Sequence, residues 1–171
     1  MSSNADPVYP DCPIIARTVD VRGLAKPELI RELARNEVSM NPYGELLFAD
    51  ERFTTSGESY RQKTVELRVR DLGFAKGETS EEIFKRASAF GLEVCPLELA
   101  PYLRLQFLEQ PEGDRITISS HKISEDEAFP NGFYLIRRDD GLWLRGYRAS
   151  SDNVWSPDEH FIFCRSLDSH A

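Results

Sequence analysis

The chain has 171 residues, and its 21 basic and 29 acidic side chains give a formal net charge of −8. Hydrophobic residues make up 40% of the sequence and aromatic residues 11%, which excludes collagen-like, low-complexity and mostly disordered classes. A chain of this length buries enough surface for one hydrophobic core, so we expect one domain. The acidic balance argues against direct binding to nucleic acid, because a phosphate backbone requires clustered Lys and Arg.

Nothing in the sequence indicates export or a membrane segment. No apolar run approaches the ~18 consecutive residues that a membrane helix needs, and residues 1–13 lack the basic and apolar regions of a secretory signal. The cysteines at positions 12, 95 and 164 are widely spaced and form no C-x-x-C pair. We therefore expect a cytoplasmic protein with neither a disulfide framework nor a structural zinc site.

The domain organisation is predicted to be simple. We expect a flexible N-terminal arm over residues 1–13, one domain over residues 14–166 and a C-terminal tail over residues 167–171, because untethered termini are usually mobile. Within the domain, the first elements in chain order are a strand at 14–21, a helix at 27–36 with a proline in its first turn, and a short helix at 43–53.

Two further elements of the first half have distinct local signatures. Residues 63–70 are predicted to form a strand with one buried and one solvated face, because the apolar Val65, Leu67 and Val69 alternate with polar side chains at the even positions 64–70. Residues 80–90 are predicted to form a helix. Thr79 and Glu82 have the spacing of a capping box, and Gly91 suits the end of the helix.

The second half is rich in predicted strands. These cover residues 92–95, 103–109, 115–120, 132–138, 142–148 and 160–165. Pro96 and Pro101 leave room for only one helical turn between them, and Asp139-Asp140-Gly141 favours a tight hairpin. The predicted fold is α+β, with two or three N-terminal helices packed on a C-terminal antiparallel meander of about five strands. The helices would lie against one face of this sheet, or the sheet would curl strongly into a half-barrel.

Known catalytic and cofactor motifs are absent. The chain has no P-loop, no G-x-S-x-G elbow, no H-E-x-x-H pair and no G-x-G-x-x-G loop, so we expect no cofactor and no metal site. The remaining candidates for catalysis are Asp158 and His160, which are two residues apart and share one side of a strand, with His121 as a third group. Cys95 is a candidate nucleophile. The alternative roles are a backbone turn around Asp158 and a buried thiol at Cys95.

A second constellation lies on the predicted sheet. Arg104 and Gln106 on one strand and Trp143 and Arg145 on another would gather on one face if the strands are neighbours, with Trp155 in the loop at the rim. Arginine and aromatic side chains are enriched at protein interfaces, and they also stack on and pair with anionic molecules. The alternative is an ordinary solvated sheet face on which the arginine stems lie flat.

Three stretches of the chain resemble a family of small uncharacterised bacterial proteins. They are ELLFADERFTTSGESY, then DLGFAKGETSEEIFKRASAFGLEVCPLELAPYLRLQFLEQPEG, then GFYLIRRDDGLWLRGYRASSDNVWSPDEHFIFC. The resemblance as a whole covers residues 25–165. The resemblance implies one intact bacterial domain and adds no catalytic residue. Some members carry a helicase designation, but a helicase motor needs a P-loop and two motor lobes, and this chain has neither the motif nor the length.

The sequence therefore favours a binding protein that uses the mixed arginine and aromatic face. Its partner would be another protein or an anionic small molecule. One alternative is a small enzyme of unrecognised type that uses His160, Asp158, His121 or Cys95. A second alternative is an accessory protein of a nucleic-acid-processing system, which would touch nucleic acid only through its partner.

Overall fold

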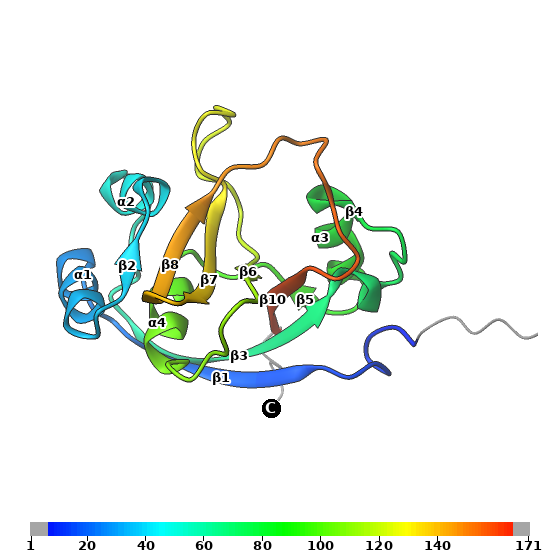
Figure 1. Cartoon of the computed structure of the whole chain (residues 1–171), viewed down its shortest axis with the longest axis horizontal. Helices are drawn as coiled ribbons and strands as arrows, with labels where there is room; N and C mark the ends of the chain where they lie inside the picture. Colours follow the sequence, from blue (N-terminus) through cyan, green and yellow to red (C-terminus); the bar gives the residue numbers. More distant parts are fainter. Residues whose placement is uncertain (1–6, 166–171) are drawn as a thin grey trace, which may run out of the picture.

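Both halves of the chain contribute strands to one curled sheet (Figure 1). The computed structural model describes residues 7–165. The strands of this sheet are β1 (Ile15–Arg22), β2 (Ser39–Met40), β3 (Ser59–Arg68), β5 (Leu92–Glu93), β6 (Ile116–Ile118), β7 (Gly132–Arg138), β8 (Gly141–Tyr147) and β10 (His160–Arg165). Their order is β1-β3-β10-β6-β7-β8-β2, and β5 pairs with β10 beside this path. A separate two-stranded sheet consists of β4 (Glu78–Thr79) and β9 (Val154–Trp155).

The α+β class and the curled sheet are as predicted, but the C-terminal antiparallel meander is not. The sheet is mixed, because β10 pairs in parallel with β6 and β2 pairs in parallel with β8. The last strand lies between β3 and β6, so it joins the two halves of the chain. Phe161, Ile162 and Phe163 on β10 are all 0% exposed. A strand that is apolar on both faces is suited to the middle of a sheet that is covered on both sides.

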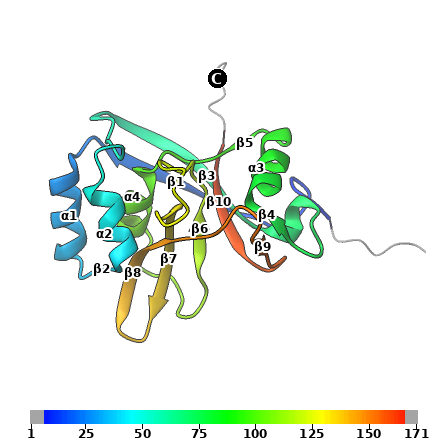
Figure 2. The same ribbon diagram turned by 90° about the horizontal axis from the view of Figure 1, so that it is seen from above.

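The helices cover both faces of the sheet (Figure 2). They are α1 (Lys26–Arg35), α2 (Pro42–Ala49), α3 (Ser80–Ala89) and α4 (Leu99–Gln106). Helices α2 and α4 pack on the face that we call the inner face, and α1 packs against α4. On the opposite, outer face, α3 covers β3 and β10, where its Ile83 and Ala87 join a second core with Phe161 and Phe163.

Helix α4 replaces the strand predicted at 103–109. Pro101 is the third residue of α4, where a backbone N–H has no partner within the helix, so this proline is compatible with the helix start. The first six residues of α4 are all buried, from Leu99 to Arg104. The alternation of Leu103, Arg104 and Leu105 fits a strand locally, but packing between β1, α1 and β7–β8 selects the helix.

Strand β3 also differs from its prediction. It begins at Ser59, and it ends at Arg68 where a 3-10 turn, Val69–Leu72, follows. Its even-numbered face is buried instead of solvated, because it lies on the side of the sheet where its β10 neighbours Ile162 and Cys164 join the inner core. Thr64 is 1% and Glu66 is 5% exposed. A carboxylate at such a position must be paired.

The segment before β1 lies against the domain. The Tyr9 backbone N–H donates to the Asp71 carbonyl at 2.7 Å, and Tyr9 and Cys12 are both buried in the outer core. This segment was expected to belong to a flexible arm; residues 1–6 of that arm and the predicted tail at 167–171 lie outside the described residues. Within residues 7–165, none of the helices has the length and apolar character needed to cross a bilayer.

Asn41 closes the outer edge of β8. Its side-chain amide donates to the Gly146 carbonyl at 2.9 Å, and its carbonyl oxygen accepts from the backbone N–H groups of Gly146 at 2.8 Å and Gly44 at 2.9 Å. One side chain thus continues the pairing of β2 with β8 and also caps the start of α2. A Cβ on Gly146 would lie 2.7 Å from the backbone carbon of Tyr43, so the close approach of α2 requires glycine there.

Candidate functional site

The structure separates the side chains that the sequence placed on one sheet face. Trp143 and Arg145 lie on the outer face of β8, and both are half-buried. Arg104 and Gln106 lie on α4, on the other side of the sheet, so their predicted place beside Trp143 is wrong. The cause is the helix that replaces the predicted strand.

Arg104 is an interior side chain and is 0% exposed. Its guanidinium donates to the carbonyls of Phe107 at 2.6 Å and Trp143 at 3.2 Å, and to the side-chain carbonyl of Gln110 at 2.7 Å. Burial lowers the pKa of Arg104 to about 10. The residue ties the turn after α4 to β8, and it does not face solvent.

Gln106 is exposed, but its side-chain amide is hydrogen-bonded to the backbone of β1. Its side-chain amide donates to the backbone carbonyl of Asp20 at 2.8 Å, and its carbonyl oxygen accepts from the Asp20 N–H at 2.9 Å. The amide therefore extends the edge of β1 as a short strand would. Its role in the described structure is to hold α4 to β1.

A row of alternating aromatic rings and arginines crosses the outer face instead. We call it the aromatic–arginine row, and it consists of Trp143, Arg145, Tyr134, Arg115 and Trp155. The Arg145 guanidinium carbon lies 4.9 Å from the Trp143 ring centre and 6.0 Å from that of Tyr134. The Arg115 guanidinium carbon lies 3.8 Å from the Tyr134 ring centre and 5.6 Å from that of Trp155. Each guanidinium thus lies between two rings, as cation–π attraction favours.

The hydrogen bonds of the row fix its side chains. Arg145 Nε donates to the Tyr134 hydroxyl at 2.7 Å, and Trp143 Nε1 donates to Asp140 Oδ1 at 2.8 Å. Within residues 7–165 the two terminal nitrogens of Arg145 make no further hydrogen bond, so their N–H groups are open to an acceptor. At the end of the row that is opposite Trp143, Trp155 is buried, and Arg115 Nε lies 3.9 Å from Glu159 Oε1.

Arg115 was not among the residues singled out in the sequence. It precedes β6 by one residue and alternates with Thr117, which was a usable local signal. Its ring neighbours, however, come from β7 and β9, which no local pattern connects to it.

The candidates for catalysis are held apart by other partners. Asp158 accepts from Arg70 at 2.6 Å, and His160 Nδ1 lies 2.8 Å from Glu66 Oε2. Within the described residues, none of the four candidates is hydrogen bonded to another of the four. His121 and Cys95 line one shallow hollow, but the Cys95 thiol donates to the Ile162 carbonyl at 3.7 Å. Burial, then the neighbouring Cys164, raise the pKa of Cys95 well above its ordinary value, whereas a nucleophilic thiol needs a lowered one.

Glu66 is the centre of a buried charge cluster. Its carboxylate accepts from Arg17 at 2.7 Å through Oε1 and from the His160 ring through Oε2. Burial favours the neutral carboxyl, but the hydrogen bonds from His160 and Arg17 outweigh it, so the pKa of Glu66 is lowered. The hydrogen bond to Glu66 in turn raises the pKa of His160 against the effect of its partial burial.

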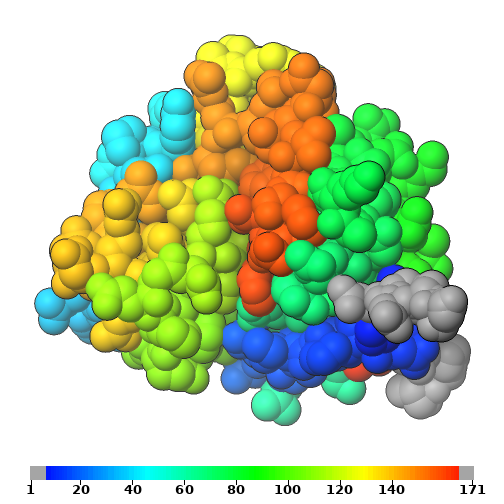
Figure 3. All heavy atoms as spheres, turned by 45° about the vertical axis from the view of Figure 1, so that its right-hand side comes forward, coloured from blue at the N-terminus to red at the C-terminus, as the bar shows by residue number. Residues whose placement is uncertain are grey.

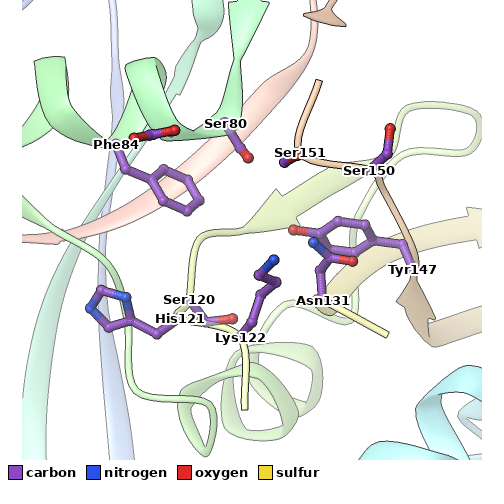
Figure 4. A pocket seen from close by; sticks show the side chains of 10 residues that line it. Ser80, Phe84, Ser120, His121, Lys122, Asn131, Tyr147, Ser150 and Ser151 are labelled. Carbon is purple, nitrogen blue, oxygen red and sulfur yellow. The ribbon is translucent and has the colours of Figure 1, made fainter. Parts of the chain in front are cut away.

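A hollow of about 260 Å³, which we call the α3 pocket, opens between α3 and the two loops that follow β6 and β8 (Figure 4). It is lined by Ser80, Glu81, Phe84, Ser120, His121, Lys122, Asn131, Tyr147, Ser150 and Ser151. In Figure 3 the orange segment after β8 lies beside the yellow loop before β7 and beside α3 in green. Within residues 7–165, no group of three or more His, Cys, Asp or Glu side chains is placed to hold a metal ion.

No protein-family model, curated protein or solved structure that we compared with the chain matches it. The resemblance to small bacterial proteins therefore stays a prediction.

Proposed function

We propose that the protein is a non-catalytic binding protein whose aromatic–arginine row binds an acidic segment of a partner protein. The observation that carries this proposal is the open guanidinium edge of Arg145, held between Trp143 and Tyr134 on a half-buried sheet face. A guanidinium edge can bind a carboxylate through two parallel hydrogen bonds.

The row is suited to binding because its side chains are already ordered. The hydrogen bonds to Asp140 and Tyr134 hold Trp143 and Arg145, so little side-chain entropy remains to be lost when a partner docks. Tryptophan, tyrosine and arginine are the residue types that dominate binding energy in protein interfaces.

The position of α3 supports the same assignment. Helix α3 covers the outer face over β3 and β10, while Ile136, Trp143 and Arg145 on β7 and β8 stay half-exposed. The inner face of β7 and β8 is filled by α2 and α4. The outer side of this hairpin is thus a rigid surface with an apolar middle and a cationic edge.

The test is a comparison of three baits in native lysate, each verified to be folded. They are the wild type, the double variant Trp143→Ala/Arg145→Ala, and a matched control, Ile30→Ala/Arg31→Ala, which removes one apolar side chain and one arginine from the exposed side of α1. We expect a partner that wild type and control retain and the row variant loses. A partner retained equally by all three would contradict the proposal.

A photo-crosslinking residue at position 136 on β7, beside the row, identifies the chemistry of the bound segment. Ile136 pairs with Trp143 across the β7–β8 hairpin. We expect its crosslinked peptides to come from an Asp- and Glu-rich segment. Crosslinks to neutral or basic segments only would show that the partner is not recognised through Arg145.

A further inference from the structure

The α3 pocket contains a buried hydroxyl without a partner. Ser120 is 5% exposed, and its Oγ makes no hydrogen bond within residues 7–165. Figure 4 shows the Ser120 side chain at the floor of the pocket, next to Lys122. A Cβ on Gly132 would lie 2.7 Å from this oxygen, so the absence of a side chain there leaves room for it. Buried polar groups are nearly always hydrogen-bonded, so this hydroxyl at the pocket wall is available to bond with a ligand.

The other donors around the pocket face the same space. The Lys122 side chain reaches into it, and the hydroxyls of Ser80 and Tyr147 point toward it from opposite sides (Figure 4). Burial raises the pKa of Tyr147 to about 12, so its hydroxyl keeps its proton. Within the described residues the Tyr147 hydroxyl, like that of Ser120, has no hydrogen-bond partner.

The N-terminal end of helix α3 lies at the pocket. The helix has ten residues and begins at Ser80, which lines the pocket. The Thr79 side chain caps the helix by accepting from the Glu82 N–H at 3.4 Å, and this leaves the N–H groups of Ser80 and Glu81 without a capping side chain. The N-terminal end of a helix favours negative charge through these N–H groups and through the helix dipole.

The walls and the size of the pocket set limits on the ligand. The Phe84 ring and the Tyr147 ring stand on opposite sides of the space in Figure 4. At about 260 Å³ the pocket is smaller than the sites that hold drug-sized ligands. Glu81 is the one carboxylate among the described lining residues, and its charge opposes an anion there.

From these observations we infer that the α3 pocket binds a small organic anion, with a phosphate or carboxylate group between Lys122 and the start of α3 and an apolar ring between Phe84 and Tyr147. The Ser120 and Tyr147 hydroxyls would donate to the anionic group. This inference is independent of the aromatic–arginine row.

The first experiment uses phenyl phosphate as the probe, with inorganic phosphate and phenol as its two halves. Titrations followed by amide NMR shifts and by calorimetry should show that phenyl phosphate binds and shifts the amides of Ser80, Glu81 and Lys122. We expect it to bind roughly tenfold more tightly than inorganic phosphate, because only phenyl phosphate uses the rings. No shift of these amides at about 10 mM phenyl phosphate would overturn the inference.

Three variants separate the pocket from general charge effects. Lys122→Met should weaken binding of phenyl phosphate roughly tenfold or more, since it removes a charge-assisted hydrogen bond. Lys85→Met is the matched control, because Lys85 lies on α3, whose start borders the pocket, but lines the neighbouring hollow instead. Equal weakening by both variants would overturn the inference. Glu81→Gln should strengthen binding, because it removes the opposing charge.

Ser120→Ala gives a result that a purely structural role would not give. Because its hydroxyl has no partner within residues 7–165, the substitution should leave the melting temperature unchanged or raise it, while it weakens binding of phenyl phosphate severalfold. A fall in melting temperature with unchanged affinity would show that the hydroxyl serves the fold and would contradict its assignment to the ligand.

Discussion

His160 and Glu66, which are 94 residues apart in the sequence, meet across β10 and β3 with Nδ1 2.8 Å from Oε2. Arg17 on β1 completes the cluster from the opposite side of the carboxylate. Because Glu66 is 5% exposed, the stability of the fold depends on its charge being paired with these two partners. The two buried carboxylate oxygens of Glu66 thereby link the strands β1, β3 and β10.

This cluster predicts a pH range of greatest stability. The raised pKa of His160 contributes stability that is fully present below the ordinary His value of 6.5 and is lost as the pH rises through the folded pKa. The lowered pKa of Glu66 contributes stability that is present above the ordinary Glu value of 4.5 and is lost as the pH falls through the folded pKa. We expect the contribution of the pair to be largest between these two ordinary values.

Urea unfolding at closely spaced pH values checks this expectation. The His160→Gln variant should lose the decline of unfolding free energy that the wild type shows as the pH rises from the ordinary His value. His121→Gln, which alters an exposed histidine, serves as the control and should keep the wild-type profile. An unaltered profile in His160→Gln would mean that the stability does not depend on this pair.

Arg104 predicts a large loss of stability from a substitution that keeps most of the side-chain volume. Arg104→Met leaves the carbonyls of Phe107 and Trp143 and the Gln110 side chain without their donor. Each buried acceptor left unsatisfied costs about 1–3 kcal/mol, so we expect the free energy of unfolding to fall by about 3 kcal/mol. Arg35→Met, at an exposed arginine on α1, should change it by less than about 0.5 kcal/mol. Similar values for both variants would refute the bracing role of Arg104.

Local signals in the sequence were sufficient for the elements that local interactions stabilise. Thr79 caps α3 by accepting from the Glu82 N–H, as predicted, but the return bond of a capping box is replaced, because the Thr79 N–H donates to the Glu78 side chain. The Asp139-Asp140-Gly141 turn joins β7 to β8 with Arg138 opposite Gly141. Where the deciding interactions are distant, sequence patterns were insufficient. The alternation around Arg104 suits a strand, and only its partners on the turn after α4 and on β8 show why it lies in a helix.

The candidate site illustrates the same limit. Trp143 and Arg145 share one strand, so a period of two was enough to place them on one face. Arg115 joins them only because β6 and β8 both pair with β7, which brings Tyr134 between the two arginines. The pairing of Glu66 with His160 depends likewise on the insertion of β10 beside β3. Strand order is a long-range property, and no short motif in this chain encodes it.

Asn41 predicts a stability loss that an ordinary helix cap does not produce. Asn41→Ala removes three hydrogen bonds, one at the start of α2 and two at the edge of β8. We expect the free energy of unfolding to fall by about 2–3 kcal/mol, more than the roughly 1 kcal/mol of a typical cap. Asn41→Asp keeps the acceptor but loses the donor to Gly146, so its loss in urea unfolding should be intermediate. A loss no larger than that of a cap would show that the bonds to β8 contribute nothing.

The exposure of Trp143 can be measured without a partner, because the chain has only two tryptophans. Trp155 is 8% exposed and Trp143 is half-buried. The Trp155→Phe variant, which retains Trp143, should emit at longer wavelength and be quenched more strongly by acrylamide than Trp143→Phe, which retains Trp155. Equal quenching of the two variants would show that Trp143 is no more accessible than Trp155, which contradicts an accessible end of the row.

If Trp143 is accessible, a partner that docks on the row must shield it, so the quenching of Trp155→Phe should fall when the partner is added. A partner that binds without protecting Trp143 binds elsewhere on the molecule.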